Sequence, residues 1–171
     1  IGDMHLDIVA ERFKNKFGVD IVLKEPKIPY RETIKKKVEV QGRHKKQSGG
    51  AGQFGDVWLR IEPYKDGEFL FGEEVFGGAV PKNYFPAVEK GVVEAMREGI
   101  LAGYPATNIK VTLYDGSYHP VDSNEMSFKI AGSLAFKKGA EMANPVILEP
   151  IMNLTIKIPE QYLGDIMGDI N

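Results

Sequence analysis

Apolar residues recur every three or four positions at the start of the chain, which is the period of one helix face. This pattern predicts a helix over residues 3–17, with Asp3 as a candidate N-cap and Gly18 as its C-terminal stop. Apolar and polar residues then alternate over residues 19–23, as they do in a strand. A helix joined to a strand through one glycine cannot bury both apolar faces alone, so we expect these residues to complete a larger α+β unit.

The end of the chain has a similar pattern. Residues 146–148 and 154–158 are predicted strands, and Pro159 stands where a helix with one apolar face can begin. The chain starts at Ile1 and stops inside this last helix. We therefore expect it to be a piece of a longer protein, cut within one unit at its start and within another at its end.

The middle of the chain predicts a long hairpin. Extended apolar spacing over residues 34–40 is followed by a polar, glycine-rich stretch at residues 47–53, and alternation resumes over residues 57–61. The glycine-rich stretch is therefore predicted to be the tip between two strands. Further strands are predicted at residues 69–76 and 109–113.

Two helices are predicted in the same region. One covers residues 82–101, and another begins at Asp122, whose spacing to Glu125 is an acidic relative of the capping box. Their predicted buried stripes are Phe85, Val88, Val92, Met96 and Ile100 in the first helix, and Met126, Ile130 and Leu134 in the second. The order is strands, helix, strand, loop and helix, which predicts an α+β domain with the loop at residues 115–121 and the glycine-rich tip at one end.

Composition narrows the class of protein. The 171 residues are 43% hydrophobic, which is enough for a packed core, and they include no cysteine. A disulfide framework, thiolate zinc ligands and a cysteine nucleophile are therefore excluded. No stretch approaches the roughly 18 apolar residues of a membrane span, and no basic and then apolar leader opens the chain. We expect a cytoplasmic globular protein with no membrane partner.

The charge is unevenly distributed, although the net charge is only −2. Between Arg31 and Gly55 there are seven basic residues against two acidic ones. Four of the residues in this region, Arg43, His44, Lys45 and Lys46, directly precede the glycine-rich stretch. Lysine and arginine provide the sequence-independent part of nucleic-acid affinity, so this stretch is a candidate contact with a polyanion.

The glycine-rich stretch also invites a phosphate-cradle interpretation, because closely spaced glycines let backbone N–H groups approach an anion. However, no Gly-Lys-Ser or Gly-Lys-Thr sequence follows, and Phe54 and Val57 continue into a strand where a phosphate loop requires a helix. A flexible surface turn and a contact with a polyanion are therefore favoured over a phosphate cradle.

His119 is the other candidate for chemistry. It lies too far along the sequence from His5 and His44 to suggest a metal motif. Asp122 with Ser117 or Ser123 could suggest a hydrolase, but no nucleophile-elbow signature is present. His119 is therefore either a solvated loop residue or, beside Tyr118, a contact with RNA through stacking or hydrogen bonding.

Seven motifs, in order and in register over essentially the whole chain, resemble the bacterial translation elongation factor G family. They are GDMHLD at residues 2–7 with FGV at 17–19, YRETI at 30–34, KQSGGAGQFG at 46–55, DGSYH at 115–119, VDSNEM at 121–126, PVILEPIM at 145–152 and GDIMGDIN at 164–171.

The resemblance implies three domain pieces. Residues 1–27 would end the family's third domain, residues 28–148 would form the fourth, and residues 149–171 would begin the fifth. The fourth domain would be α+β with a left-handed βαβ crossover, like the second domain of small-subunit ribosomal protein S5. The other two pieces would be incomplete ferredoxin-like units.

The resemblance also implies a function. In that family the tip loops of the fourth domain reach the decoding region of the small ribosomal subunit, where tRNA and mRNA move together. The implied tip-loop contacts are Gln47, Ser48, Gly49, Gly50, Ala51, Gly52, Gln53, Tyr118, His119, Pro120, Val121, Asp122 and Ser123. The implied contacts with rRNA phosphates are Arg43, His44, Lys45 and Lys46.

The resemblance implies no catalytic or metal-binding residue for this chain, so we expect it not to be an enzyme. We also expect it to be a monomer. GTP and magnesium would bind a GTPase domain elsewhere in the parent protein. Ala51 stands where many housekeeping members have arginine, which leaves open a paralogue that acts in ribosome recycling or ribosomal protection. A metabolic enzyme of S5-like fold, with the glycine-rich loop around a phosphorylated ligand, is the competing class.

Overall fold

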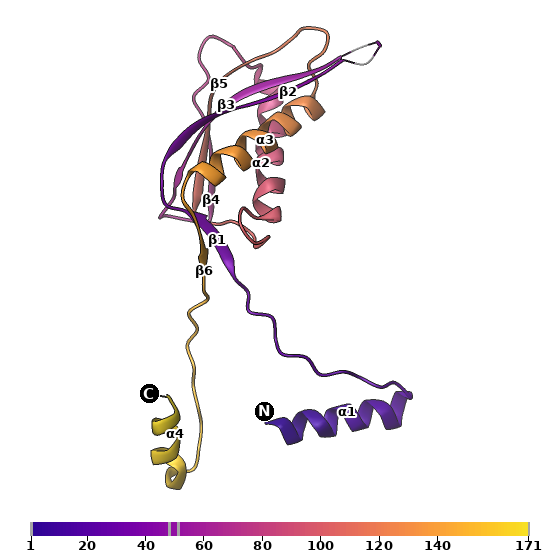
Figure 1. Cartoon of the computed structure of the whole chain (residues 1–171), viewed down its shortest axis with the longest axis vertical. Coiled ribbons are helices and arrows are strands. Elements are labelled where there is room, and N and C mark those ends of the chain that lie inside the picture. Colours follow the sequence, from indigo (N-terminus) through magenta and orange to yellow (C-terminus); the bar gives the residue numbers. More distant parts are fainter. Residues whose placement is uncertain (1, 48, 51, 171) are drawn as a thin grey trace.

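The computed structural model describes residues 2–47, 49–50 and 52–170, apart from the side chain of Asp3. In chain order the elements are α1 (Asp3–Phe17), β1 (Arg31–Ile34), β2 (Val38–Lys46), β3 (Gln53–Pro63), β4 (Phe69–Glu73), the 3-10 turn η1 (Lys82–Tyr84), α2 (Phe85–Glu98), β5 (Ile109–Ser117), α3 (Glu125–Met142), β6 (Pro145–Leu148), the 3-10 turn η2 (Glu160–Tyr162) and α4 (Leu163–Ile170). Figure 1 shows a body built from β2 to α3, a two-stranded stem below it, and α1 and α4 beyond extended segments.

The body is a four-stranded sheet in the order β2-β3-β5-β4, and α2 and α3 pack against each other and against one shared core. Strands β2 and β3 form the predicted long hairpin, in which Lys46 pairs with Gln53. Strands β4 and β5 are parallel and are connected through α2. The prediction of an α+β domain with a βαβ crossover is confirmed.

Helix α2 follows its predicted stripe, because Phe85, Val88, Val92 and Met96 are all buried. The helix ends at Glu98 and not at residue 101, since Gly99 turns the chain with φ of +85°.

The predicted stripe of α3 is wrong. Met126 and Leu134 are 58% and 44% exposed, and Ile130 is only partly buried. The buried residues of α3 are instead Ser127, Phe128, Ala131, Gly132, Ala135, Phe136, Gly139 and Ala140. This face is made mostly of small residues because α3 lies very close to its neighbours: a Cβ atom at Gly42 of β2 would overlap the backbone at Ala131. A pattern of large apolar residues does not mark such a face.

Strands β1 and β6 form the stem, in which Arg31 pairs with Leu148 and Ile34 with Pro145. The stem is joined to the body at Glu32, which forms a parallel bridge with Ala106 in the segment before β5. Both connections between the body and the rest of the chain pass through this stem (Figure 1).

The Glu32 side chain is fully buried at this junction. Its carboxylate accepts hydrogen bonds from the backbone N–H groups of Ile100, Leu101 (2.7 Å), Ala102 (2.7 Å) and Tyr104 (3.0 Å). Burial alone raises the pKa of Glu32, but the four donors outweigh it and hold this pKa below its usual value. A buried ionised carboxylate is thus fully paired with backbone donors, and it ties the stem to the loop after α2.

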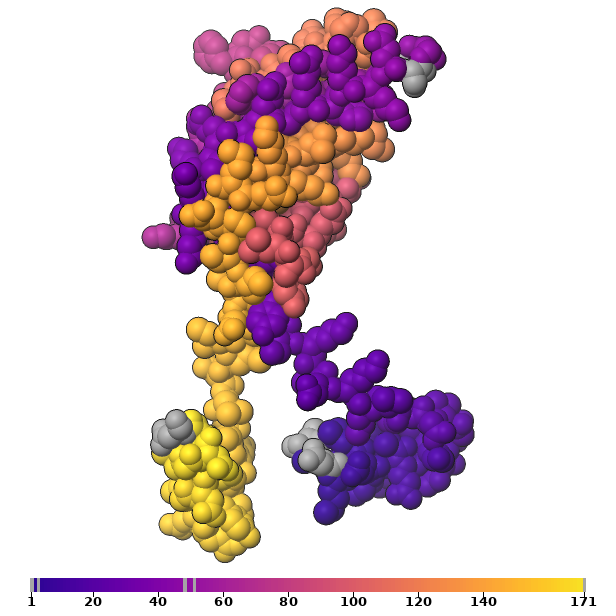
Figure 2. Space-filling view, viewed as in Figure 1, coloured from indigo at the N-terminus to yellow at the C-terminus, as the bar shows by residue number. Residues whose placement is uncertain are grey.

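The two ends of the chain differ from the prediction. Helix α1 forms and ends at Gly18, whose φ is +66°, but Gly2 and not Asp3 is the N-cap residue. Residues 19–23 and 154–158 are extended without strand pairing in the described part of the chain, so the strands predicted there are wrong. A strand requires a partner for its backbone groups, and alternation alone cannot supply one. The apolar residues of α1 and α4 are largely exposed. Figure 2 shows the two ends of the chain as separate lower lobes.

Candidate nucleic-acid interface

The glycine-rich tip and the histidine loop meet at the end of the body that lies away from the stem (Figure 1). The Gly52 N–H donates to Oδ1 of Asp122 at 2.9 Å, and the Phe54 N–H donates to the Asp122 carbonyl at 2.8 Å. The Ser123 hydroxyl donates to the Phe54 carbonyl at 2.8 Å. Three hydrogen bonds therefore join segments that lie about 70 residues apart, and the prediction that both loops share one end is confirmed.

Asp122 does not cap the following helix, so this prediction is wrong. Asn124 is the N-cap of α3, and its Oδ1 accepts from the Ser127 N–H at 2.8 Å. Asp122 lies two residues too early for that role, and its carboxylate faces Gly52 instead. Asp122 therefore joins the two loops and does not cap α3.

Replacing Asp122 by alanine should loosen the glycine-rich tip. The variant removes the acceptor for the Gly52 N–H, an interaction with an ionised group that is worth about 1.5–3 kcal/mol. We expect the Gly52 amide to exchange with deuterium about tenfold or more faster, as measured by NMR. Asp115→Ala is the matched control, because among the described residues Oδ1 of Asp115 accepts only from its neighbour Gly116. Equal protection of Gly52 in both variants would contradict the role of Asp122.

The His119 ring is half exposed, and its orientation is set by its own loop. Nδ1 accepts from the N–H groups of Val121 (3.3 Å) and Asp122 (3.2 Å). In the neutral ring this places the proton on Nε2. Within the described residues no group accepts from Nε2, so it can donate to an external acceptor. If Nδ1 also gains a proton, Oδ2 of Asp122 lies 3.4 Å away to pair with it.

Phe54 connects the histidine to the basic strand. The Arg43 guanidinium lies 5.4 Å from the Phe54 ring centroid, and the Phe54 and His119 rings meet edge to face at 6.4 Å. These residues lie around a hollow of about 350 Å³, which is lined by Arg43, Lys45, Lys46, Gln47, Gln53, Phe54, His119 and Asp122. Cations and an aromatic ring in one hollow suit a phosphate and a base of an unpaired nucleotide.

The basic run does not form one uniform patch. Successive side chains of β2 point to opposite faces, so Arg43 and Lys45 lie on the face of Phe54, whereas His44 lies on the other. Lys46 ends the strand and still lines the hollow. On that other face Nε2 of His44 and Oε1 of Gln53 are 2.8 Å apart. Within the described residues Arg43, Lys45 and Lys46 form no ion pair, so their charges are available to a polyanion.

Other predicted contacts lie in the same two loops but are not among the residues that line this hollow. Gly49 and Gly50 have positive φ, of 52° and 127°, which a glycine adopts readily. Tyr118 and Val121 are 46% and 74% exposed. Pro120 follows His119 in the same exposed loop, while Ser48 and Ala51 lie outside the described residues.

Sequence reasoning missed Phe54. The available signal was an aromatic residue directly after the glycine-rich stretch, at the position that pairs with Lys45 across the hairpin. The sequence pattern indicates only that Phe54 leads into the returning strand.

These features define a class, an α+β domain on a narrow stem that presents two joined polar loops at its far end. Over 99% of its length the chain is similar to a crystal structure of a protein from Thermus thermophilus, with a TM-score of 0.86 and 45% sequence identity. The chain spans 25% of the length of that protein.

The family described as elongation factor G, domain IV, matches residues 26–144. The chain therefore belongs to the elongation factor G domain IV family. None of the helices in the described residues is both long and apolar enough to cross a membrane.

Proposed function

We propose that this domain promotes the GTP-driven translocation of tRNA and mRNA on the small ribosomal subunit, as part of a cytoplasmic elongation factor. The observation that supports this most directly is the hydrogen-bonded junction of the two loops through Asp122, beside three cations that form no ion pair within the described residues. In this mechanism the joined loops occupy the space that tRNA leaves, and so bias its movement forward. The chain itself performs no catalysis, and GTP and magnesium bind a separate GTPase domain of the parent.

The proposed contacts with RNA are of two kinds, one that provides general affinity and one that provides a directed hydrogen bond. Arg43 and Lys45 supply attraction to phosphates, which depends on salt and not on sequence. The Nε2–H of His119 supplies a directed donor to a sugar, phosphate or base acceptor. Its loop keeps this donor oriented, since the two backbone donors occupy Nδ1.

Replacing His119 by alanine in the full-length factor should slow translocation while GTP hydrolysis on the ribosome stays largely unchanged. Loss of one directed hydrogen bond in the moving state corresponds to about 1.4 kcal/mol or more, a decrease of about tenfold in rate. Single-round translocation and GTP hydrolysis would be measured by rapid mixing on the same ribosomes.

His5→Ala is the matched control, because it makes the same chemical change on exposed helix α1. It should leave both rates unchanged. An equal loss of translocation and hydrolysis in the His119 variant, or a loss of neither, would contradict the assignment.

One observation favours a second function within the same family. Ala51 places a methyl group where the resemblance leads us to expect an arginine, so the tip lacks one guanidinium. A paralogue that acts in ribosome recycling or ribosomal protection would tolerate this loss. Ala51→Arg in the full-length factor distinguishes the two: a faster translocation step supports the elongation role, whereas an unchanged step with impaired subunit splitting or antibiotic rescue supports the alternative.

A further inference from the structure

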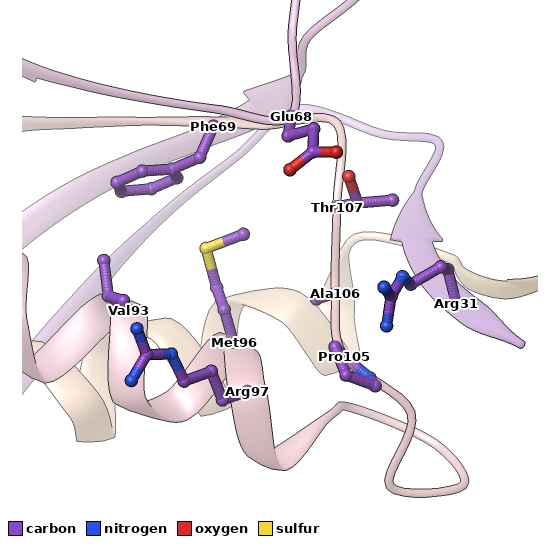
Figure 3. A pocket seen from close by; sticks show the side chains of 9 residues that line it. All are labelled: Arg31, Glu68, Phe69, Val93, Met96, Arg97, Pro105, Ala106 and Thr107. Atoms are coloured by element: carbon purple, nitrogen blue, oxygen red, sulfur yellow. The ribbon is translucent and has the colours of Figure 1, made fainter. Parts of the chain in front are cut away.

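A cavity of about 390 Å³ lies where the stem meets the body, at the opposite end of the domain from the joined loops. It is lined by Arg31, Glu68, Phe69, Val93, Met96, Arg97, Pro105, Ala106 and Thr107 (Figure 3). These residues come from β1, the start of β4, α2 and the segment before β5. The volume falls in the range of sites that bind small organic molecules.

The floor of the cavity is apolar. Met96 is 5% exposed and its side chain points into the space, with Phe69 and Val93 beside it (Figure 3). Pro105 and Ala106 line the side nearest the stem. The backbone groups of this segment are already used, since the Ala106 N–H donates to the Met96 carbonyl at 2.8 Å. The floor therefore offers apolar contact, and Thr107 is the uncharged polar side chain among the lining residues.

Two guanidinium groups stand at the rim. Arg31 comes from β1 and Arg97 from α2, on different sides of the floor (Figure 3). Both are exposed, and within the described residues neither forms an ion pair or a side-chain hydrogen bond. Glu68 is the one carboxylate among the lining residues and forms no ion pair within the described part of the chain, so two guanidinium groups against one carboxylate leave the lining with a net charge of +1. Arginine suits planar, bidentate recognition of carboxylate and phosphate groups.

We propose that this cavity binds an organic anion, a molecule whose apolar body rests on Phe69, Val93 and Met96 and whose carboxylate or phosphate is held by Arg31 and Arg97. The proposal does not depend on the translocation role, because none of these residues lies in the joined loops. It assigns the junction a ligand-binding function.

Binding would also stiffen the junction. A ligand in this cavity contacts the stem through Arg31 and the body through Arg97, beside the bridge between Glu32 and Ala106. Ligand binding stabilises only the state in which these elements are together. The Thr107 N–H, which donates to the Glu32 carbonyl at 2.8 Å, should then exchange more slowly with deuterium.

The chain carries its own reporters for a test. It has six methionines, of which Met96 lines this cavity and Met126 lines a separate hollow with Pro86 and Lys90. With methionine methyl groups labelled with carbon-13, the full chain would be titrated with 2-naphthoate, 2-naphthyl phosphate and neutral 2-naphthamide. The two anions should shift the Met96 signal saturably and leave Met126 unchanged, and the tighter of them identifies the preferred acidic group.

Arg97→Gln and Arg31→Gln should each weaken anion binding about fivefold or more, since each removes one charged donor. Lys90→Gln is the matched control, because it removes a positive charge from the adjacent hollow and not from this one. An unchanged Met142 signal would show that each variant is folded, and Met126 serves as a second reporter of folding in the two arginine variants, since it lines the hollow that contains Lys90. An unmoved Met96 signal, equal binding of the neutral amide, or an equal loss in the Lys90 variant would overturn the proposal.

Discussion

Replacing Glu32 by alanine is expected to destabilise the domain by about 4 kcal/mol or more. The change removes a fully buried carboxylate and leaves four backbone N–H groups without their acceptor, and each unsatisfied donor costs about 1–3 kcal/mol before relaxation. Because the same carboxylate holds the stem against the loop after α2, the stem should separate from the body first. Urea unfolding, followed by the fluorescence of Trp58, measures the loss of free energy.

Glu149→Ala is the control, since Glu149 is exposed just beyond the stem. It should change the free energy of unfolding by less than about 0.5 kcal/mol. Glu32→Gln should fall between the two, because the amide keeps one oxygen acceptor but adds a donor that faces N–H groups. A loss in Glu32→Ala no larger than that of the control would contradict the structural role of the buried carboxylate.

The same site predicts a dependence on pH. Burial raises and the four N–H donors lower the pKa of Glu32, and the net shift lies below the ordinary value of 4.5. A depressed pKa in the folded state means that the stabilisation is fully present above the unfolded pKa. It is lost as the pH falls from about 4.5 through the folded pKa. The difference in free energy of unfolding between the natural chain and Glu32→Gln should therefore be constant near neutral pH and shrink below pH 4.5.

The parts of the fold that could be predicted from sequence are those in which large apolar side chains mark one face. The stripe of α2 and the alternation of β3 are of this kind, because Val88, Val92, Leu59 and Ile61 all point into the core. The stripe of α3 could not be found in this way. Its contact face depends on Ala131, and apolar periodicity gives weight to large side chains such as the exposed Met126.

The candidate site divides in the same way. The resemblance placed His119 and the glycine-rich stretch in two loops, and the order of elements indicated that these loops share an end. Neither the resemblance nor the order of elements could indicate that Asp122 joins the two loops. Its partner Gly52 is about 70 residues away in the sequence, and the spacing from Asp122 to Glu125 favoured a role as a helix cap. The buried, hydrogen-bonded role of Glu32 could not be predicted for a similar reason, because its four partners belong to a loop about 70 residues further along the chain.

Gly91→Ala is expected to lower the free energy of unfolding by about 3 kcal/mol or more, although alanine is normally the better residue inside a helix. Gly91 lies in α2 where it crosses α3, and a Cβ atom there would overlap the carbonyl oxygen of Lys129 and lie 2.9 Å from its carbonyl carbon. The obstacle is backbone, so no rotamer change relieves it, and the two helices must move apart over buried Val88 and Val92. Thermal and urea unfolding would measure the loss.

Gly168→Ala supplies the matched control for this substitution, because Gly168 also lies in a helix, α4, and has nothing within 4 Å of the added Cβ atom. There the usual preference for alanine should appear as no loss or a gain of up to about 1 kcal/mol in helix stability. Opposite signs at the two glycines would show that backbone contact between α2 and α3, and not helix propensity, requires glycine at position 91. If Gly91→Ala unfolds at the same urea concentration as the natural chain, the close crossing of the two helices is wrong, and with it the account of why α3 buries small residues.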